Sequence, residues 1–174
     1  MKFVIKEKTP AENKALCEKY PFLTWRGDPL YVGSYSKDRE PDYKYTWEDE
    51  MPDGWRKAFC PRIWDELKAI LEKADFVNEF EFMQIKEKFG TLRLYYCGIP
   101  AEISKELSDW EDKYDKLSEQ TCIICGEPAT QMTTGWITYV CDDCAKEMGG
   151  RTIPIKDLDE YYDNPKKYWE THTN

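Results

Sequence analysis

The spacing of apolar residues along the chain predicts three helices. Thr9-Pro10-Ala11-Glu12 has the order of a capping box with proline in the first turn, so a helix is expected to begin there and to end before Pro21. Between residues 55 and 74, apolar side chains recur three and four positions apart. Pro61 either kinks this helix or marks the start of its main part after a short turn, and we favour the second interpretation.

The third predicted helix spans residues 101–119. Its apolar stripe consists of Ile103, Leu107, Trp110, Tyr114 and Leu117. The opposite face is strongly acidic. Such a stripe can face the core, the cysteine-rich segment or a second copy of the chain, which makes a homo-oligomer an open alternative. Core packing is the favoured interpretation because the stripe is too short for a coiled coil.

Alternation of apolar and polar residues predicts strands. Residues 80–97 are expected to form a β-hairpin that turns near Gly90, because Leu92, Leu94 and Tyr96 share one face. In residues 42–47 aromatic and polar residues alternate, which predicts a half-buried strand. Residues 31–35 are expected to form another short strand, and the rest of the aromatic-rich segment 21–50 is expected to be loop.

Composition and charge narrow the class of protein. The chain has 174 residues, of which 41% are hydrophobic and 34% charged, so disorder throughout is excluded. No apolar run reaches the roughly 18–20 residues of a membrane span. Residues 1–6 are too short and too charged for a signal peptide, so a soluble, cytoplasmic protein is expected.

The net charge of −9 is concentrated in one region. Residues 99–120 contain 7 acidic and 3 basic residues, and residues 121–150 contain 4 acidic and 1 basic residue. Because such a region repels phosphate backbones, DNA and RNA are not expected as partners.

Two Cys-x-x-Cys pairs carry the most specific signal, namely Cys122 with Cys125 and Cys141 with Cys144. Their spacing matches a zinc ribbon, in which four thiolates surround one Zn²⁺ at about 2.3 Å. Residues 136–140 are expected to form the strand that returns the second pair to the first. A four-cysteine site has no open position for water, so a structural ion is expected. Iron in a rubredoxin-like site fits the same spacing, and two redox pairs are the other alternative.

The remaining nucleophilic residues give no catalytic pattern. Cys17, Cys60 and Cys97 are interpreted as small hydrophobic residues rather than reactive thiols. His172, the single histidine, lies in the C-terminal tail. Neither a phosphate-binding glycine loop nor a hydrolase motif is present, so enzymatic activity is not expected.

Basic and aromatic residues suggest a second function. Guanidinium, ammonium and aromatic groups together can bind a ligand that carries a phosphate and a base. The candidate ligand-binding residues are Trp25, Arg26, Tyr43, Tyr45, Lys86, Lys88 and Arg93. The ordinary alternative, which we favour, is that they are surface charges of a hairpin and part of an aromatic core.

Three segments of the chain resemble an uncharacterised family of small phage and prophage proteins. They are the stretch Pro52-Asp53-Gly54-Trp55-Arg56-Lys57-Ala58-Phe59, the hairpin Gln84-Ile85-Lys86-Glu87-Lys88-Phe89-Gly90-Thr91-Leu92-Arg93-Leu94-Tyr95, and the cysteine ribbon that follows the acidic helix. Together they cover roughly residues 50–145. The resemblance implies a phage context and brings no established activity or catalytic residue.

We therefore expect an α+β protein with a small antiparallel sheet, about three helices and a C-terminal zinc ribbon. The expected parts are a core over residues 1–120, a ribbon over 121–150 and a tail over 151–174 that packs Ile153, Ile155, Leu158 and Tyr161 on the body or partly frays. The expected function is non-enzymatic: a phage accessory or counter-defence factor that binds and inhibits a host protein. The alternative is a sponge that sequesters a nucleotide-like signalling molecule.

Overall fold

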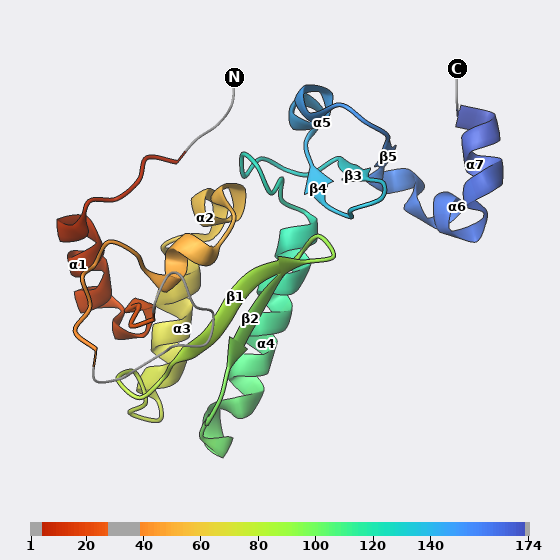
Figure 1. The fold of residues 1–174 in the computed structure, drawn as a ribbon. Coiled ribbons are helices and arrows are strands. Elements are labelled where there is room, and N and C mark those ends of the chain that lie inside the picture. Colours follow the sequence, from red (N-terminus) through yellow and green to blue (C-terminus); the bar gives the residue numbers. More distant parts are fainter. Residues whose placement is uncertain (1–4, 28–38, 173–174) are drawn as a thin grey trace.

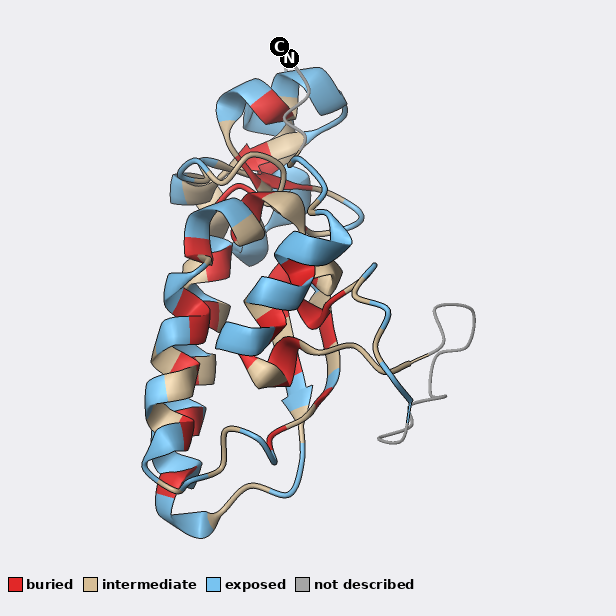
Figure 2. Cartoon of the chain, turned by 90° about the vertical axis from the view of Figure 1, so that its left-hand side faces the viewer, coloured by how far each residue is buried: buried red, intermediate tan, exposed pale blue. Residues whose placement is uncertain are grey.

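The computed structural model describes residues 5–27 and 39–172 and has an α+β fold, as predicted (Figure 1). Helices α3 and α4 pack against each other, and the apolar face of the hairpin β1–β2 packs against the core that they form. The elements of this body are α1 (Pro10–Lys19), α2 (Asp53–Phe59), α3 (Arg62–Glu72), β1 (Phe82–Lys88), β2 (Thr91–Tyr96) and α4 (Ala101–Glu119). Buried positions line the inward sides of these elements (Figure 2).

Helix α1 begins where the capping box predicted. The Thr9 hydroxyl accepts a hydrogen bond from the Glu12 backbone N–H at 3.3 Å, and the Glu12 carboxylate accepts one from the Thr9 N–H at 2.7 Å. These bonds satisfy backbone donors that the helix leaves without intrahelical partners. The predicted helix start is confirmed.

Helices α2 and α3 replace the single helical stretch of residues 55–74. Helix α2 ends at Phe59, and Pro61 stands immediately before α3. The favoured interpretation of Pro61 is therefore confirmed: a short helix precedes the main one. Helix α3 buries Ile63, Trp64, Leu67 and Leu71 in the core.

The hairpin and the acidic helix also match their predictions. Strands β1 and β2 pair antiparallel, with Lys86 opposite Arg93. The loop that joins the two strands is two residues long. Helix α4 buries Ile103, Leu107, Trp110 and Tyr114, and Leu117 is partly buried against the same core. The stripe on α4 therefore packs on the core, as expected.

The strand predicted over residues 42–47 is wrong. That segment contains bends, a single bridge between Thr24 and Thr46, and then the 3₁₀ helix η2 (Trp47–Glu50). The Asp49 carboxylate accepts a hydrogen bond from the Thr46 N–H at 2.8 Å, and the Asp42 carboxylate accepts one from the Lys44 N–H at 3.0 Å. Such local side-chain bonds compete with a strand ladder. The strand predicted over 31–35 lies outside the described residues.

Within residues 21–50 the aromatic side chains nevertheless contribute to the core. A second short 3₁₀ helix, η1 (Pro21–Leu23), buries Phe22 and Leu23. The Phe22 ring lies 6.3 Å from that of Trp64 and 6.0 Å from that of Phe80, measured between centroids.

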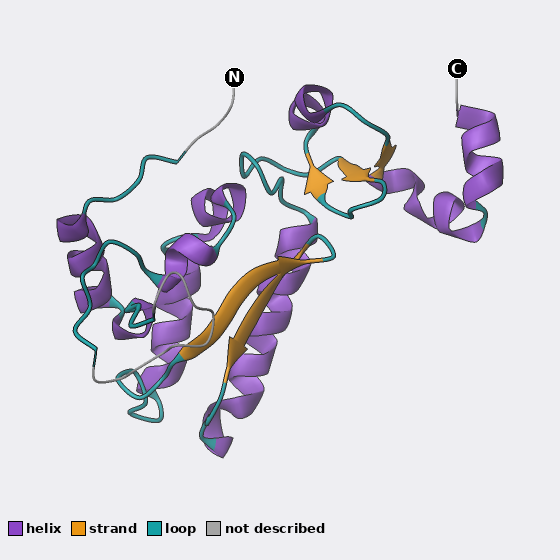
Figure 3. Ribbon diagram, viewed as in Figure 1, coloured by secondary structure: helices purple, strands orange, loops and turns teal. Residues whose placement is uncertain are grey.

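The C-terminal third forms a small sheet with order β4-β3-β5, shown in orange in Figure 3. Its elements are β3 (Gln131–Thr133), β4 (Tyr139–Val140), α5 (Asp142–Met148), β5 (Thr152–Pro154), the 3₁₀ helix η3 (Ile155–Asp157), α6 (Leu158–Asp163) and α7 (Pro165–His172). The strand predicted over residues 136–140 is much shorter than expected, because only its last two residues pair with β3.

The tail belongs to this sheet. Ile153 on β5 is buried together with Met132 and Tyr168. Leu158 and Tyr161 pack against these three residues, whereas Ile155 is not part of the cluster. The described part of the tail is thus largely helical and packs on the ribbon sheet, which corrects the prediction that it packs on the body. Among the described helices, none combines the length and apolar composition needed to cross a bilayer.

Candidate metal centre

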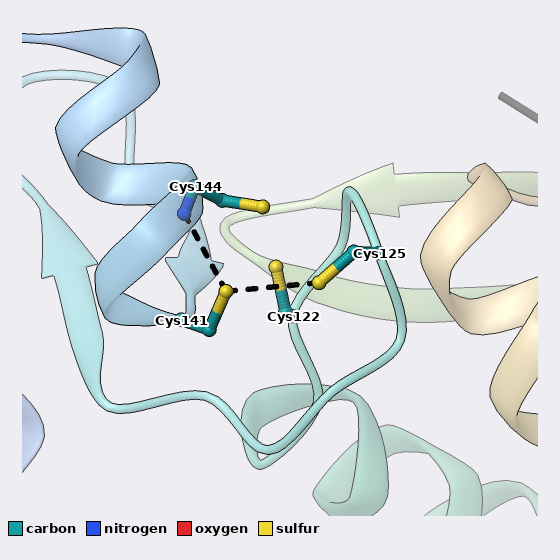
Figure 4. Close-up of side chains that lie close together, drawn as sticks. All are labelled: Cys122, Cys125, Cys141 and Cys144. Atoms are coloured by element: carbon teal, nitrogen blue, oxygen red, sulfur yellow. Dashed lines mark hydrogen bonds between the residues drawn. The ribbon is translucent and has the colours of Figure 1, made fainter. Parts of the chain in front are cut away.

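The four predicted cysteines converge on one point (Figure 4). Their sulfur atoms all lie within 4.8 Å of one another, and the Cys125 and Cys141 sulfurs are 3.6 Å apart. Sulfurs at the corners of a tetrahedron about 2.3 Å from a central zinc are about 3.8 Å apart. All four are free thiols rather than disulfides. The cluster can therefore hold one metal ion.

The first pair, Cys122 and Cys125, lies on a tight turn directly after α4. The Cys122 N–H donates to the Glu127 carbonyl at 2.7 Å, and the Gly126 N–H donates to the Cys122 carbonyl at 2.9 Å. Gly126 has a φ of +78°, a conformation that glycine adopts without a steric penalty. This turn points both sulfurs toward the centre of the cluster (Figure 4).

The second pair is held by helix α5. Cys141 is the N-cap residue, and its sulfur accepts a hydrogen bond from the Cys144 N–H at 3.5 Å. Next to it, Asp142 accepts hydrogen bonds from Thr130 Oγ1 and Gln131 Nε2, both at 2.8 Å. Those two bonds lower the pKa of Asp142 and tie the start of α5 to β3.

The ionisation of the cluster favours a bound cation. Burial raises the pKa of Cys144, and the neighbouring thiols raise it further. Burial also acts to raise the pKa of Cys122, but hydrogen bonds from nearby backbone N–H groups outweigh it, so the net shift is downward. Four neighbouring thiols cannot all ionise without positive charge among them, and a divalent metal ion supplies it.

Helix α2 supports the first cysteine pair, a role that sequence analysis missed. The Gly54 N–H donates to the Ile123 carbonyl at 2.9 Å. A Cβ at Gly54 would lie 2.2 Å from the Cys122 carbonyl oxygen, and one at Gly126 would lie 2.6 Å from the Gly54 carbonyl oxygen. The two backbones therefore meet at a contact that only glycine permits. The available signal was Gly54 itself, which directly precedes the predicted helical stretch of residues 55–74.

Two side chains of α2 reinforce this contact. Lys57 Nζ donates to the Cys125 carbonyl at 2.9 Å and forms an ion pair with Glu127 at 3.1 Å. The Trp55 indole N–H donates to the Thr121 carbonyl at 3.2 Å, and Trp55 is fully buried. The segment after Pro52 thus connects the body to the turn that carries Cys122 and Cys125.

The candidate ligand-binding residues fall into two groups. Trp25 packs its ring on Tyr45 and Trp47, with centroids 5.5 and 4.4 Å apart. The Tyr45 hydroxyl donates to Glu50 at 2.7 Å, and Arg26 donates to the Arg39 carbonyl at 2.9 Å. In the same region Tyr43 is partly buried and its carbonyl accepts a hydrogen bond from Asn13.

The second group is on the hairpin. Lys86 and Arg93 are cross-strand neighbours, Lys88 lies at the end of β1, and Arg93 pairs with Asp115 of α4 at 2.7 Å. Within the described ranges, no hydrogen bond, ion pair or ring contact joins the two groups.

The other cysteines and the histidine have structural surroundings. Cys17 is buried in the body, and Cys97 is exposed after β2. Burial and the adjacent Glu48 raise the pKa of the Cys60 thiol. The His172 ring stacks on Tyr168 at a centroid distance of 4.2 Å.

The geometry of the cysteine cluster therefore makes it a candidate metal site. Four sulfurs at ligand spacing, two of them buried, make this the best-defined chemical site in the described part of the chain. Comparison with family models, with curated proteins and with solved structures finds no match to this chain.

Proposed function

We propose that this chain is a non-enzymatic interaction protein in which one structural Zn²⁺ holds the ribbon together and fixes it to the α+β body. The observation that carries this proposal is the convergence of four cysteine sulfurs within 4.8 Å. Zinc is proposed over iron because a closed four-cysteine site is the usual structural zinc site, and Zn²⁺ adopts tetrahedral geometry without a redox function.

The size of the ribbon supports a structural role for the ion. Its strands are two or three residues long, and the apolar cluster around the cysteines contains only Cys122, Val140 and Cys144 as buried members. So small a core does not by itself offset the conformational entropy of ordering the cysteine turns, because the other buried cluster of this sheet, around Met132, Ile153 and Tyr168, does not include the cysteines. Metal binding and local folding are then the same event.

The chemistry of the available groups supports binding over catalysis. All four clustered thiols serve as ligands, which leaves no coordination position for water or substrate. Cys60, whose pKa is raised, is a poor nucleophile because little thiolate exists at neutral pH. We further propose, from the resemblance to the phage family, that the partner is a host protein which this chain binds and inhibits in the cytoplasm.

The nucleotide-sponge alternative has weaker support. Trp25 and Tyr45 pack on each other, with ring centroids 5.5 Å apart. Arg93 already pairs with Asp115. A ligand that needed all seven candidate residues would have to join two separate groups.

The test of the metal site is elemental analysis of the purified chain together with amide hydrogen exchange. We expect one zinc per chain and slow exchange in residues 121–150. Cys125→Ser should release the zinc and open this segment, whereas Cys97→Ser, which changes an exposed cysteine outside the cluster, should retain both properties. A metal-free chain with a protected ribbon, or a chain that contains iron, would contradict the proposal.

A further inference from the structure

The tip of the β1–β2 hairpin holds an aromatic residue in an unfavourable conformation. Phe89 and Gly90 form the two-residue loop and have φ values of 55° and 80°. Positive φ at both positions is the pattern of a type I′ turn, which favours asparagine or glycine first. A bulky residue there is a conformational outlier. Phe89 is also 68% exposed, so packing within this chain does not explain its presence.

A second exposed aromatic residue stands on the ribbon loop that meets this hairpin. Trp136 is 76% exposed, yet its loop is held in place: Thr133 Oγ1 donates to the Trp136 carbonyl at 2.7 Å and accepts from the Thr138 N–H at 3.0 Å. The loop is therefore ordered, and it presents the indole to solvent.

The hairpin tip and the ribbon loop are in contact. A Cβ added at Gly90 would lie 3.0 Å from the Tyr139 ring and 3.4 Å from a methyl group of Ile137. Figure 1 shows the tip of the hairpin extending toward the ribbon sheet. Phe89 precedes Gly90 and Trp136 precedes Ile137, so both aromatic residues adjoin this contact.

Two lysines, Lys86 and Lys88, lie next to exposed aromatic rings on the outer face of the hairpin. Lys86 lies over the Tyr95 ring, with its ammonium 5.0 Å from the centroid, and Lys88 lies 5.5 Å from the centroid of Phe89. Lys86 also stands opposite Arg93, and like charges in such a pair are unfavourable. Among the described residues, no carboxylate forms an ion pair with either lysine. The Glu87 carboxylate, which accepts a hydrogen bond from the Gly90 N–H at 2.6 Å, also lies at the tip, so the positive charge of this surface comes from the ammonium groups of the two lysines.

We propose that the tip surface, made of Phe89, Trp136, Lys86 and Lys88, docks a short acidic and apolar segment of a partner protein. Exposed aromatic side chains flanked by cations match a peptide that alternates apolar side chains with carboxylates. The occupant is a short peptide rather than a nucleic acid because a long polyanion would extend beyond the two lysines over a chain whose net charge is −9.

The inference rests on the proposed function and deepens it, because the surface has one half on the metal-binding ribbon. Trp136 lies in the loop between Cys125 and Cys141, so this half requires the folded ribbon. Phe89 belongs to the body and remains in place without metal. Zinc removal should therefore weaken binding of the peptide without removing the hairpin half of the site.

The test is an NMR titration of the full-length, zinc-loaded, ¹⁵N-labelled protein. The probe is a twelve-residue peptide of alternating glutamate and leucine, compared with its glutamine counterpart and with a thymidine dodecanucleotide. We expect the glutamate peptide to shift the Phe89 amide and the Trp136 indole signals, and to bind at least about tenfold more tightly than the other two probes.

Variants separate docking from a structural role. Phe89→Asn should raise the melting temperature, because asparagine suits the turn, and should weaken peptide binding by about tenfold or more. Trp136→Ala should weaken binding similarly without changing the fold.

The contribution of charge is tested with two double variants, each of which replaces two lysines by glutamate, so that both have the same net charge. Lys86→Glu with Lys88→Glu should abolish the preference for the glutamate peptide. Lys14→Glu with Lys166→Glu, which changes two exposed lysines on α1 and α7, should preserve it. Zinc content, measured on every sample, shows whether a loss of binding comes from a lost metal site.

Three results would overturn the inference while zinc remains bound. They are the absence of shifts with the glutamate peptide at about 1 mM, equal or tighter binding of the oligonucleotide, and unchanged peptide binding in a destabilised Phe89→Asn variant. The last result would assign Phe89 to the fold.

Discussion

Substituting Gly54 by alanine tests the contact between α2 and the metal-binding turn. In an ordinary helix this change is stabilising by about 1 kcal/mol, because alanine loses less backbone entropy than glycine. Here the new Cβ would lie 2.2 Å from the Cys122 carbonyl oxygen and 2.6 Å from the Ile123 carbonyl group. Both neighbours are backbone atoms of the turn that aims the sulfurs, so they cannot move aside as a flexible side chain would. The helix and the turn must separate.

The cost follows from what the separation breaks. The hydrogen bonds from the Gly54 N–H to Ile123 and from Lys57 to the Cys125 carbonyl are both 2.9 Å long. Their loss costs about 1 kcal/mol each. Overpacking against a rigid neighbour adds about 1–3 kcal/mol. After subtraction of the helix-propensity gain, Gly54→Ala should lower the free energy of unfolding by about 2–4 kcal/mol.

The measurement is urea denaturation of the zinc-loaded protein, with amide exchange to locate the change. Exchange should accelerate at Ile123 and Gly126, while the zinc content stays at one per chain. Gly98→Ala is the control: Gly98 has a φ of +70°, but a Cβ at this position would have no neighbouring atom within 4 Å, so the variant measures the conformational penalty alone, about 1–2 kcal/mol. If Gly54→Ala were as stable as the wild type or more stable, the tight contact of α2 with the turn would be refuted.

Three further substitutions test other parts of the fold. Glu48→Ala should cost about 2–4 kcal/mol in a denaturant titration, because the buried carboxylate accepts the Trp64 indole N–H at 2.6 Å and pairs with a lysine. Burial raises the pKa of Glu111, so the folded state holds that proton more tightly and stability falls as pH rises above the unfolded value of about 4.3. Glu111→Gln should remove this decline and stabilise the protein at pH 7, as unfolding at pH 4.5 and 7 would show. Ile153→Ala should cost about 2–4 kcal/mol without releasing zinc, since Ile153 packs on Met132 outside the cysteine cluster.

The elements that the sequence predicted well are those with local causes. The capping box at Thr9 fixes the start of α1, and a stripe of apolar residues at helical spacing defines α4. The hairpin follows from alternating strands around Gly90. Each signal lies within a few residues of the structure that it determines, so no knowledge of distant contacts is required.

The failures have non-local or competing causes. At residues 42–47 the alternation of aromatic residues is genuine, but local bonds to Asp42 and Asp49 bend the backbone and the rings reach the core without a strand. The strand before Cys141 was predicted too long because Thr133 closes the preceding loop with hydrogen bonds to Trp136 and Thr138. Turn chemistry outweighed residue preference in both segments.

The candidate metal site was likewise predicted where its causes are local and missed where they are distant in sequence. Cysteine spacing alone identified all four candidate ligands, because two residues between cysteines set the geometry of each turn. The support from Gly54, Trp55 and Lys57 was not predicted, because about 70 residues separate them from the turn that they contact and cysteine spacing does not report such distant contacts.

The position of the cluster makes the ribbon and the body thermodynamically dependent on each other. The first cysteine pair follows α4 directly, touches α2 through Gly54, and belongs to the same ribbon as the loop that covers Gly90 of the hairpin. A ligand that binds only the folded state stabilises whatever folds with its site. Zinc should therefore raise the unfolding temperature of the body as well as that of the ribbon. In Gly54→Ala the same zinc titration should shift the body transition less than in the wild type, while the ribbon transition still shifts, because the Gly54 contact is one of several connections through which the ion stabilises the body.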